Sequence, residues 1–145
     1  MKVQTRYFGE IEVSEEKQIF FKEGIPGFEE LKRFILIEEK DSSFCQLQSV
    51  EKREISFTII DPFKIKKDYA PNIREDYFET IGGGKTEEFA LYVIVKGGET
   101  LEDTTVNLQG PLLIQVEKRQ GIQVIVEEGY TTRHKLIDLL KKGDE

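Results

Sequence analysis

The stretch closest to a known chemical motif is a run of glycines followed by lysine and threonine, Gly82-Gly83-Gly84-Lys85-Thr86. A phosphate-binding loop cradles phosphate oxygens with backbone amides, and its pattern requires another glycine separated by four residues from the Gly-Lys-Thr. Glu79 stands at that position instead. A true phosphate-binding loop also follows a strand and begins a helix. In this chain the spacing of apolar residues predicts the reverse, a helix before the glycines and a strand after them. We therefore interpret the run as a helix stop and a flexible loop.

Two further side chains could do chemistry, and each is the only one of its type: His134 and Cys45. One histidine and one cysteine make no recognisable metal site, and no cofactor is predicted. The two could still meet in space as base and nucleophile, although no neighbouring residue supports that pairing. Because aspartate and glutamate are abundant, a pair of catalytic carboxylates also stays open. A small hydrolase or ligand-binding β domain that uses His134 and surface carboxylates is therefore the alternative to a protein without catalytic activity.

The charge balance bears on the partners. The chain has 21 lysines and arginines against 28 aspartates and glutamates, which gives a net charge of −7. Direct nucleic-acid binding draws mostly on cations at phosphates, so a basic protein is the better-matched partner. No apolar run approaches the roughly 20 residues of a membrane span, and the N-terminus lacks a signal-peptide pattern. The single cysteine cannot form an internal disulfide, which agrees with a reducing compartment.

The elements that must position any site are organised around one turn, Gly24-Ile25-Pro26-Gly27-Phe28-Glu29, which follows a phenylalanine-rich strand. Pro26 fixes its own φ and pushes Ile25 toward extended geometry. Gly24 and Gly27 can each take a positive φ, and we expect at least one of them to do so. The apolar spacing after the turn predicts about two turns of helix over residues 28–34. On this evidence the stretch is a buried corner between two elements.

The rest of the chain is patterned as a mostly β protein. We predict a compact, β-barrel-like single domain, residues 1–145, of short antiparallel strands with one or two short helices. The tail after about residue 136 is expected to be a short helix or disordered. The side chains expected to be mostly buried are Phe21, Leu36, Phe57, Ile59, Val93, Leu113, Ile114 and Val124. The predicted strands span residues 3–7, 11–13, 19–21, 34–37, 44–50, 55–60, 89–95, 104–108, 112–116 and 122–126, and further helices span residues 73–81 and 133–142.

Several blocks of sequence resemble the FliW family of flagellar assembly factors. The resemblance runs from Val3 to about Leu136, and its specificity comes from the order and spacing of the blocks together. The matching residues are Gln4-Thr5-Arg6-Tyr7-Phe8-Gly9, Gly24-Ile25-Pro26-Gly27-Phe28-Glu29, Leu47-Gln48-Ser49-Val50-Glu51, Phe57 with Asp61-Pro62-Phe63, Thr105 with Asn107-Leu108 and Pro111, Gly121 with Gln123, and Tyr130 with Arg133-His134.

The resemblance implies a compact barrel-like fold and a cytoplasmic regulator without enzymatic activity. FliW-like proteins bind flagellin, and they bind the RNA-binding regulator CsrA. Flagellin captures FliW while it accumulates, and its secretion frees FliW to bind CsrA and relieve the repression of flagellin translation. The residues alone agree on an acidic protein without a catalytic motif, but they do not name these partners.

Apolar residues in and near the turns of the matched blocks predict a docking surface. Cores of protein interfaces favour apolar anchors within a polar rim. We expect a shallow apolar patch, across which flagellin would lay an amphipathic helix. The alternative is that Ile25, Phe28 and Phe63 fold inward and plug the barrel ends. The expected patch residues are Ile25, Pro26, Leu47, Val50 and Phe63, with Gln48, Glu51 and Asp61 at the rim.

A second expectation concerns the acidic residues around the first hairpin. A clustered negative field attracts a basic partner and speeds its encounter, and salt screens that attraction. The alternative is a merely solvated face, because isolated surface charges contribute little. The residues expected to steer a basic partner are Glu10, Glu12, Glu15 and Glu16.

Overall fold

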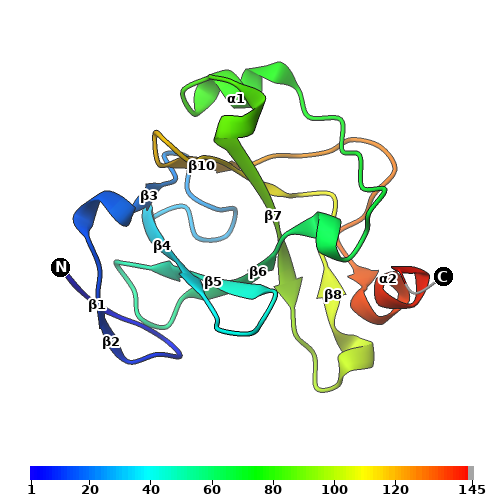
Figure 1. Cartoon of the computed structure of the whole chain (residues 1–145), viewed down its shortest axis with the longest axis horizontal. Coiled ribbons are helices and arrows are strands. Elements are labelled where there is room, and N and C mark those ends of the chain that lie inside the picture. Colours follow the sequence, from blue (N-terminus) through cyan, green and yellow to red (C-terminus); the bar gives the residue numbers. More distant parts are fainter. Residues whose placement is uncertain (144–145) are drawn as a thin grey trace.

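The chain forms a closed β-barrel (Figure 1). The structure, a computed structural model, describes residues 1–143. Seven strands follow one another around the barrel in the order β3, β4, β5, β6, β7, β9 and β10, and β10 returns to β3. All neighbouring pairs are antiparallel except the parallel pair of β10 with β3, which has a single register pair, Gln120 with Phe20. The prediction of a mostly β, barrel-like fold is confirmed.

The elements are short, as the spacing of turn residues predicts. The strands are β1 (Lys2–Gln4), β2 (Glu10–Glu12), β3 (Ile19–Phe20), β4 (Arg33–Glu38), β5 (Phe44–Ser49), β6 (Ser56–Ile60), β7 (Phe89–Lys96), β8 (Thr105–Val106), β9 (Leu112–Gln115), β10 (Gln120–Gln123) and β11 (His134–Lys135). The α-helices are α1 (Glu75–Thr80) and α2 (Leu136–Gly143), and the 3-10 helices are η1 (Glu15–Lys17), η2 (Pro62–Lys64), η3 (Thr86–Glu88) and η4 (Leu101–Asp103). In the expected C-terminal tail, residues 144–145 lie outside the described residues.

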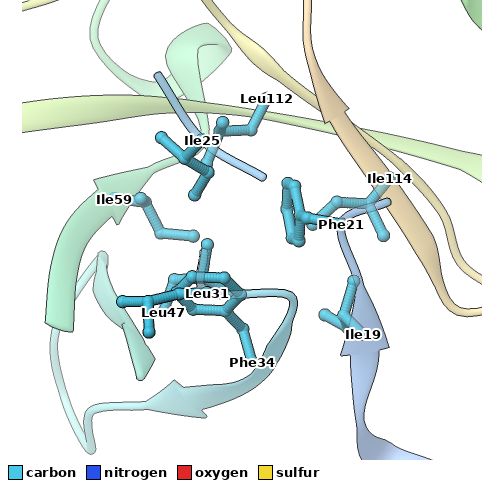
Figure 2. Close-up of a cluster of buried hydrophobic side chains, with 9 residues drawn as sticks. All are labelled: Ile19, Phe21, Ile25, Leu31, Phe34, Leu47, Ile59, Leu112 and Ile114. Atoms are coloured by element: carbon cyan, nitrogen blue, oxygen red, sulfur yellow. The ribbon is translucent and has the colours of Figure 1, made fainter. Parts of the chain in front are cut away.

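The barrel core is built from inward-facing strand residues and from the turn that follows β3. Phe21 and Phe34 are fully buried, and their rings meet edge to face with centroids 5.4 Å apart. Such aromatic pairs stabilise a core beyond the area they bury. Figure 2 shows the buried side chains converging from several strands on one interior. The barrel core comprises Ile19, Phe21, Ile25, Leu31, Phe34, Leu47, Ile59, Leu112 and Ile114.

Strand β7 connects the barrel to a smaller extension. Its first residues pair with β9, whereas Val95 and Lys96 pair with β8, which in turn pairs with β11. Beside this extension, Leu136 and Leu139 of α2 are buried in a second apolar cluster. Figure 1 places α2 and β8 on one side of the barrel and α1 at its top. A third cluster beneath α1 contains Ile81, Leu113, Ile122 and Val124, with the α1 side chains of Tyr77 and Phe78 packed against it.

The helix predicted over residues 28–34 is wrong. The chain there makes two successive turns, in which the N–H of Phe28 donates to the Ile25 carbonyl and the N–H of Leu31 to the Phe28 carbonyl. Strand β4 then begins at Arg33. The apolar spacing reflects side chains that plug the barrel, because Ile25 and Leu31 are buried and Phe28 packs against the barrel core. Tertiary packing here overrides a weak local helical preference.

Most of the predicted core is confirmed, with two corrections. Leu36 and Phe57 pack against the barrel core but stay half-buried, so their strands are correct and their full burial is not. The glycine run after α1 ends that helix, since Gly82, Gly83 and Gly84 all have positive φ. The buried residues of the predicted set are Phe21, Ile59, Val93, Leu113, Ile114 and Val124.

The turn after β3 depends on its two glycines in different ways. Gly24 has a φ of +71° and Gly27 a φ of +91°, which confirms the expected reversal. A Cβ on Gly24 would lie 2.6 Å from the Glu29 Cα, whereas a Cβ on Gly27 would have no atom within 4 Å. Gly24 is therefore required for both conformation and space, and Gly27 for conformation alone.

Replacing Gly24 with alanine should therefore destabilise the protein more than the same change at Gly27. We expect Gly27→Ala to lower the free energy of unfolding by about 1 kcal/mol, from the left-handed φ. Gly24→Ala adds a backbone clash and should cost about 2–3 kcal/mol. Urea unfolding of the two variants measures the difference. Equal losses would show that the close approach to Glu29 relaxes without cost.

Candidate functional site

A tight turn between β1 and β2 presents two aromatic side chains to solvent. We call residues 5–9 the aromatic turn. The buried Thr5 holds it: its N–H and its Oγ1 donate to the Gly9 carbonyl at 2.9 and 2.7 Å, and its Oγ1 accepts from the Phe8 N–H at 2.8 Å. Gly9 supplies the left-handed residue, with a φ of +65°. With the backbone fixed in this way, Tyr7 and Phe8 remain 55% and 41% exposed.

A buried amide fastens the aromatic turn to the barrel. The Gln48 Oε1 accepts from the Arg6 N–H at 2.9 Å. The Gln48 Nε2 lies 3.0–3.2 Å from the carbonyl oxygens of Ser49, Arg53 and Ile55. Since Gln48 is only 1% exposed, these bonds are shielded from water, and leaving its amide or the Arg6 N–H unpaired would be costly. The aromatic turn is thus held against the connection between β5 and β6.

The second strand of this hairpin and the 3-10 helix that follows it are rich in carboxylates. Two of the predicted steering residues lie on β2 and two in η1, and all four are exposed, as a charged partner would require. The Arg6 guanidinium lies 5.1 Å from the centre of the Tyr7 ring, and the Met1 ammonium lies 3.2 Å from a Glu12 carboxylate oxygen. An exposed aromatic pair within a charged surround has the composition of an interface anchor. The four carboxylates are Glu10, Glu12, Glu15 and Glu16.

The predicted apolar patch does not form as one surface. Ile25 and Leu47 are 2% and 0% exposed and lie in the barrel core (Figure 2). Their expected exposure is wrong, because the turn folds into the barrel and Leu47 faces its interior. The alternative that apolar turn residues plug the barrel is confirmed for Ile25. It is wrong for Phe63, which is 46% exposed.

The remaining apolar members of that patch lie in different surroundings. Pro26 is exposed at the turn after β3, and Val50 is half-buried after β5. Phe63 lies in η2, and its ring centre is 5.9 Å from that of Tyr69, which belongs to the second apolar cluster. Pro26, Val50 and Phe63 stay predicted contact residues. They do not form one apolar surface with Ile25 and Leu47, because those two side chains are buried in the barrel core.

The three predicted rim residues all hold backbone in place. Gln48 fastens the aromatic turn as described above. One Glu51 carboxylate oxygen accepts from the N–H groups of Lys32 and Arg33, each at 2.8 Å. Asp61 caps η2 by accepting from the Phe63 N–H at 2.9 Å. The predicted place of Gln48 at a rim is wrong, because Gln48 is buried beneath the aromatic turn. Glu51 is exposed and Asp61 is half-buried, so these two stay predicted contact residues.

The residues considered for catalysis lie on separate elements. Cys45 is on β5, and burial together with the nearby Glu38 raises the pKa of its thiol, which opposes its use as a nucleophile. His134 is on β11, outside the barrel, and its Nε2 accepts from the Thr131 N–H at 2.9 Å. Among the described residues, no three histidine, cysteine or acidic side chains come together as a metal site.

Comparison with known proteins identifies the family. The FliW protein family model matches residues 2–136. The chain is 42% identical over 144 residues to a flagellar assembly factor FliW of Caldicellulosiruptor bescii, covering 99% of this chain and 95% of that protein. It is 44% identical over 142 residues to the FliW of Caldicellulosiruptor saccharolyticus, covering 97% and 93%. The chain belongs to the FliW family.

A crystal structure of the flagellar assembly factor FliW has the same fold as this FliW-family chain. The two superpose with a TM-score of 0.88 at 39% identity, over 94% of this chain and 96% of that one. FliW is a flagellar assembly factor without enzymatic activity, and this overturns the alternative of a small hydrolase. Within the described residues, no helix has the length and apolar character needed to cross a membrane.

The exposure of Tyr7 and Phe8 was not predicted from the sequence, although both residues belong to a block that resembles the family. The sequence pattern predicted a strand over residues 3–7, whereas β1 ends at Gln4. A signal was present, because a threonine four residues before a glycine can close a turn with its hydroxyl. In this turn both adjacent aromatic side chains are exposed.

Proposed function

We propose that this chain binds flagellin and the translational regulator CsrA, and that binding to CsrA antagonises its repression of flagellin translation. It would act in the cytoplasm as a single-domain flagellar assembly factor. Family membership supplies the general role in flagellar assembly. The two named partners come from the resemblance described above.

One observation supports a binding function: a hydrogen-bonded turn keeps the Tyr7 and Phe8 side chains exposed to solvent. An exposed aromatic side chain gains favourable burial when a partner covers it, and aromatic side chains are enriched among the residues that dominate binding energies. Because the Thr5 and Gln48 hydrogen bonds already order the backbone, little conformational entropy is lost there on binding. The carboxylates of β2 and η1 would attract a basic partner.

The direct test is calorimetric titration of the purified chain with flagellin and, separately, with CsrA. We expect saturable binding to each. Preloading the chain with flagellin should reduce the CsrA heat if the two partners exclude one another. Failure to bind either protein under conditions where both are folded would overturn the proposal.

Salt should slow association with CsrA. Attraction between the acidic surface of the hairpin and a basic partner is screened over about 8–10 Å at physiological ionic strength. Reversing Glu15 and Glu16 to lysine should lower the association rate at low salt and flatten its salt dependence, with a smaller change in the dissociation rate. Stopped-flow measurements across a salt series give both rates, and Glu75→Lys with Glu87→Lys, exposed residues of α1 and η3, is the matched control. Equal salt slopes for all three proteins would indicate a merely solvated face.

A further inference from the structure

The barrel wall opens between β3 and β10. The two strands share one register pair, and the residues after Phe20 no longer pair with β10. The Phe21 N–H instead donates to the Lys32 carbonyl, and the Gly24 N–H donates to the Phe21 carbonyl, which closes a turn. Strand β10 continues to Gln123 without a neighbour on this side. The turn of residues 24–29 therefore occupies the position beside β10 that further residues of β3 would fill if that strand were longer.

The backbone of β10 offers hydrogen-bonding groups to this opening. The Val124 N–H donates to the Pro111 carbonyl on the β9 side, and the register of β9 and β10 makes Ile122 bond to β9 in the same way. In an antiparallel pair, alternate residues point their N–H and C=O groups to opposite sides. The N–H and C=O of Gln123 therefore face the opening, and no described backbone bond outside the strand ladders uses them. Such an unpaired strand edge is a template for another strand.

The opening is a groove of about 410 Å³ with acidic walls. Glu23 and Glu29 line it from the turn, and Asp76 lines it from α1, where it pairs with Arg74 at 3.2 Å. The Gly27 N–H donates to Glu29 at 2.9 Å and lowers the pKa of its carboxyl, with a smaller effect from Lys32, so this carboxylate is charged at neutral pH.

The same groove offers apolar contact between its carboxylates. Pro26 and Tyr77 line it together with Ile122. The Arg74 guanidinium, which pairs with Asp76, lies 4.8 Å from the centre of the Tyr77 ring and is not among the lining residues. A flat aromatic ring and a proline suit the apolar side chains of an extended peptide. In such a peptide, alternate side chains point the same way, about 7 Å apart, so lysines or arginines at every second position share one face and the residues between them share the other.

We propose that this groove binds an extended, basic segment of a partner protein, which adds to the free edge of β10 as a strand. The segment's backbone would pair with Gln123, its lysines or arginines would approach Glu23 and Glu29, and its remaining side chains would lie on Pro26 and Tyr77. Figure 1 places α1 and β10 on the opposite side of the barrel from β1 and β2, so this site is separate from the aromatic turn and does not rest on the function proposed there.

The test uses the intact chain and a capped hexapeptide of alternating valine and lysine. Titration is followed by amide NMR shifts, with hydrogen exchange of the Gln123 N–H as a second measurement. We expect the largest shifts around Gln123, Pro26 and Tyr77, and slower exchange at Gln123. A peptide with glutamate in place of lysine, and one N-methylated at alternate residues to block strand pairing, should each bind at least tenfold more weakly.

Protein variants separate charge from fold. Glu23→Gln combined with Glu29→Gln keeps an acceptor for the Gly27 N–H and should weaken peptide binding about fivefold at low salt. Glu30→Gln, an exposed change in the same turn outside the groove, should leave the affinity unchanged. Phe8→Ser should also leave it unchanged.

Several results would overturn the site. These are the absence of binding by the basic peptide, equal binding of the N-methylated or acidic peptide, and shifts centred on the aromatic turn. Self-association of the chain without peptide, with the same Gln123 protection, would show that the edge pairs with a second copy instead.

Discussion

Replacing Phe21 with alanine is expected to lower the free energy of unfolding by about 3–5 kcal/mol, the usual cost of truncating a fully buried phenylalanine. The Phe21 side chain is 0% exposed and meets Phe34 edge to face inside the barrel (Figure 2). The surrounding strands are tied into a closed sheet, so they can collapse only partly onto the cavity. Urea unfolding followed by circular dichroism measures the loss.

A glycine on the neighbouring strand, Gly121 of β10, lies against the Phe21 ring, which makes the expectation sharper. A Cβ on Gly121 would lie 2.6–2.9 Å from three atoms of the Phe21 ring, closer than real contacts allow. Gly121→Ala alone should therefore cost about 1–3 kcal/mol through overpacking. In the Phe21→Ala background the ring is gone, and the same change should cost little.

A double-mutant cycle tests this contact. We expect a coupling of about 1–2 kcal/mol, in the sense that the double variant is more stable than the sum of the single losses predicts. Gly97→Ala, where an added Cβ meets no atom within 4 Å and φ is not positive, serves as the control and should combine additively with Phe21→Ala. Additive losses at Gly121 would mean that the Phe21 ring moves aside freely.

The barrel could be predicted because its strands carry local signals. The continuous apolar run at residues 34–37 and the stop at Asp61-Pro62 predicted β4 and the end of β6 within one or two residues. The helix over residues 28–34 was wrong because the same apolar spacing also fits a folded-back plug. Only the enclosing barrel, assembled from distant strands, distinguishes the two.

The candidate surface was harder to predict, and β5 shows why. Residues 46–49 are all buried, although alternation predicts that every second side chain of a half-exposed strand faces water. Leu47 faces the barrel core, and Gln48 is covered because Arg6, 42 residues earlier, bonds to it. No local pattern reveals such a cover. The sequence pattern therefore predicted partner contacts at Leu47 and Gln48, which the barrel and its own N-terminal hairpin cover. It did not predict that Tyr7 and Phe8 of that hairpin are exposed.

Changing Tyr7 and Phe8 together to serine should weaken binding to flagellin or to CsrA by at least about 100-fold, because two central aromatic anchors commonly contribute that much. The Thr5 and Gln48 hydrogen bonds that fix the turn use backbone groups and remain possible in the variant. Its unfolding midpoint should therefore stay close to that of the parent. Calorimetric titration with each partner, beside a thermal unfolding curve, measures both quantities.

The control for lost apolar surface is Leu101→Ser, since Leu101 is 56% exposed in η4, on the extension beside α2. It should bind both partners normally. Thr5→Val then separates contact from order: it removes the hydroxyl that holds the turn but keeps both aromatic rings. If rigidity lowers the entropy lost on binding, this variant should lose affinity by a smaller factor than the double serine variant. Full affinity of the double serine variant for both partners would show that the aromatic turn is not the docking surface. The exposed Pro26 and Phe63 and the half-buried Val50 would then be the residues to change next.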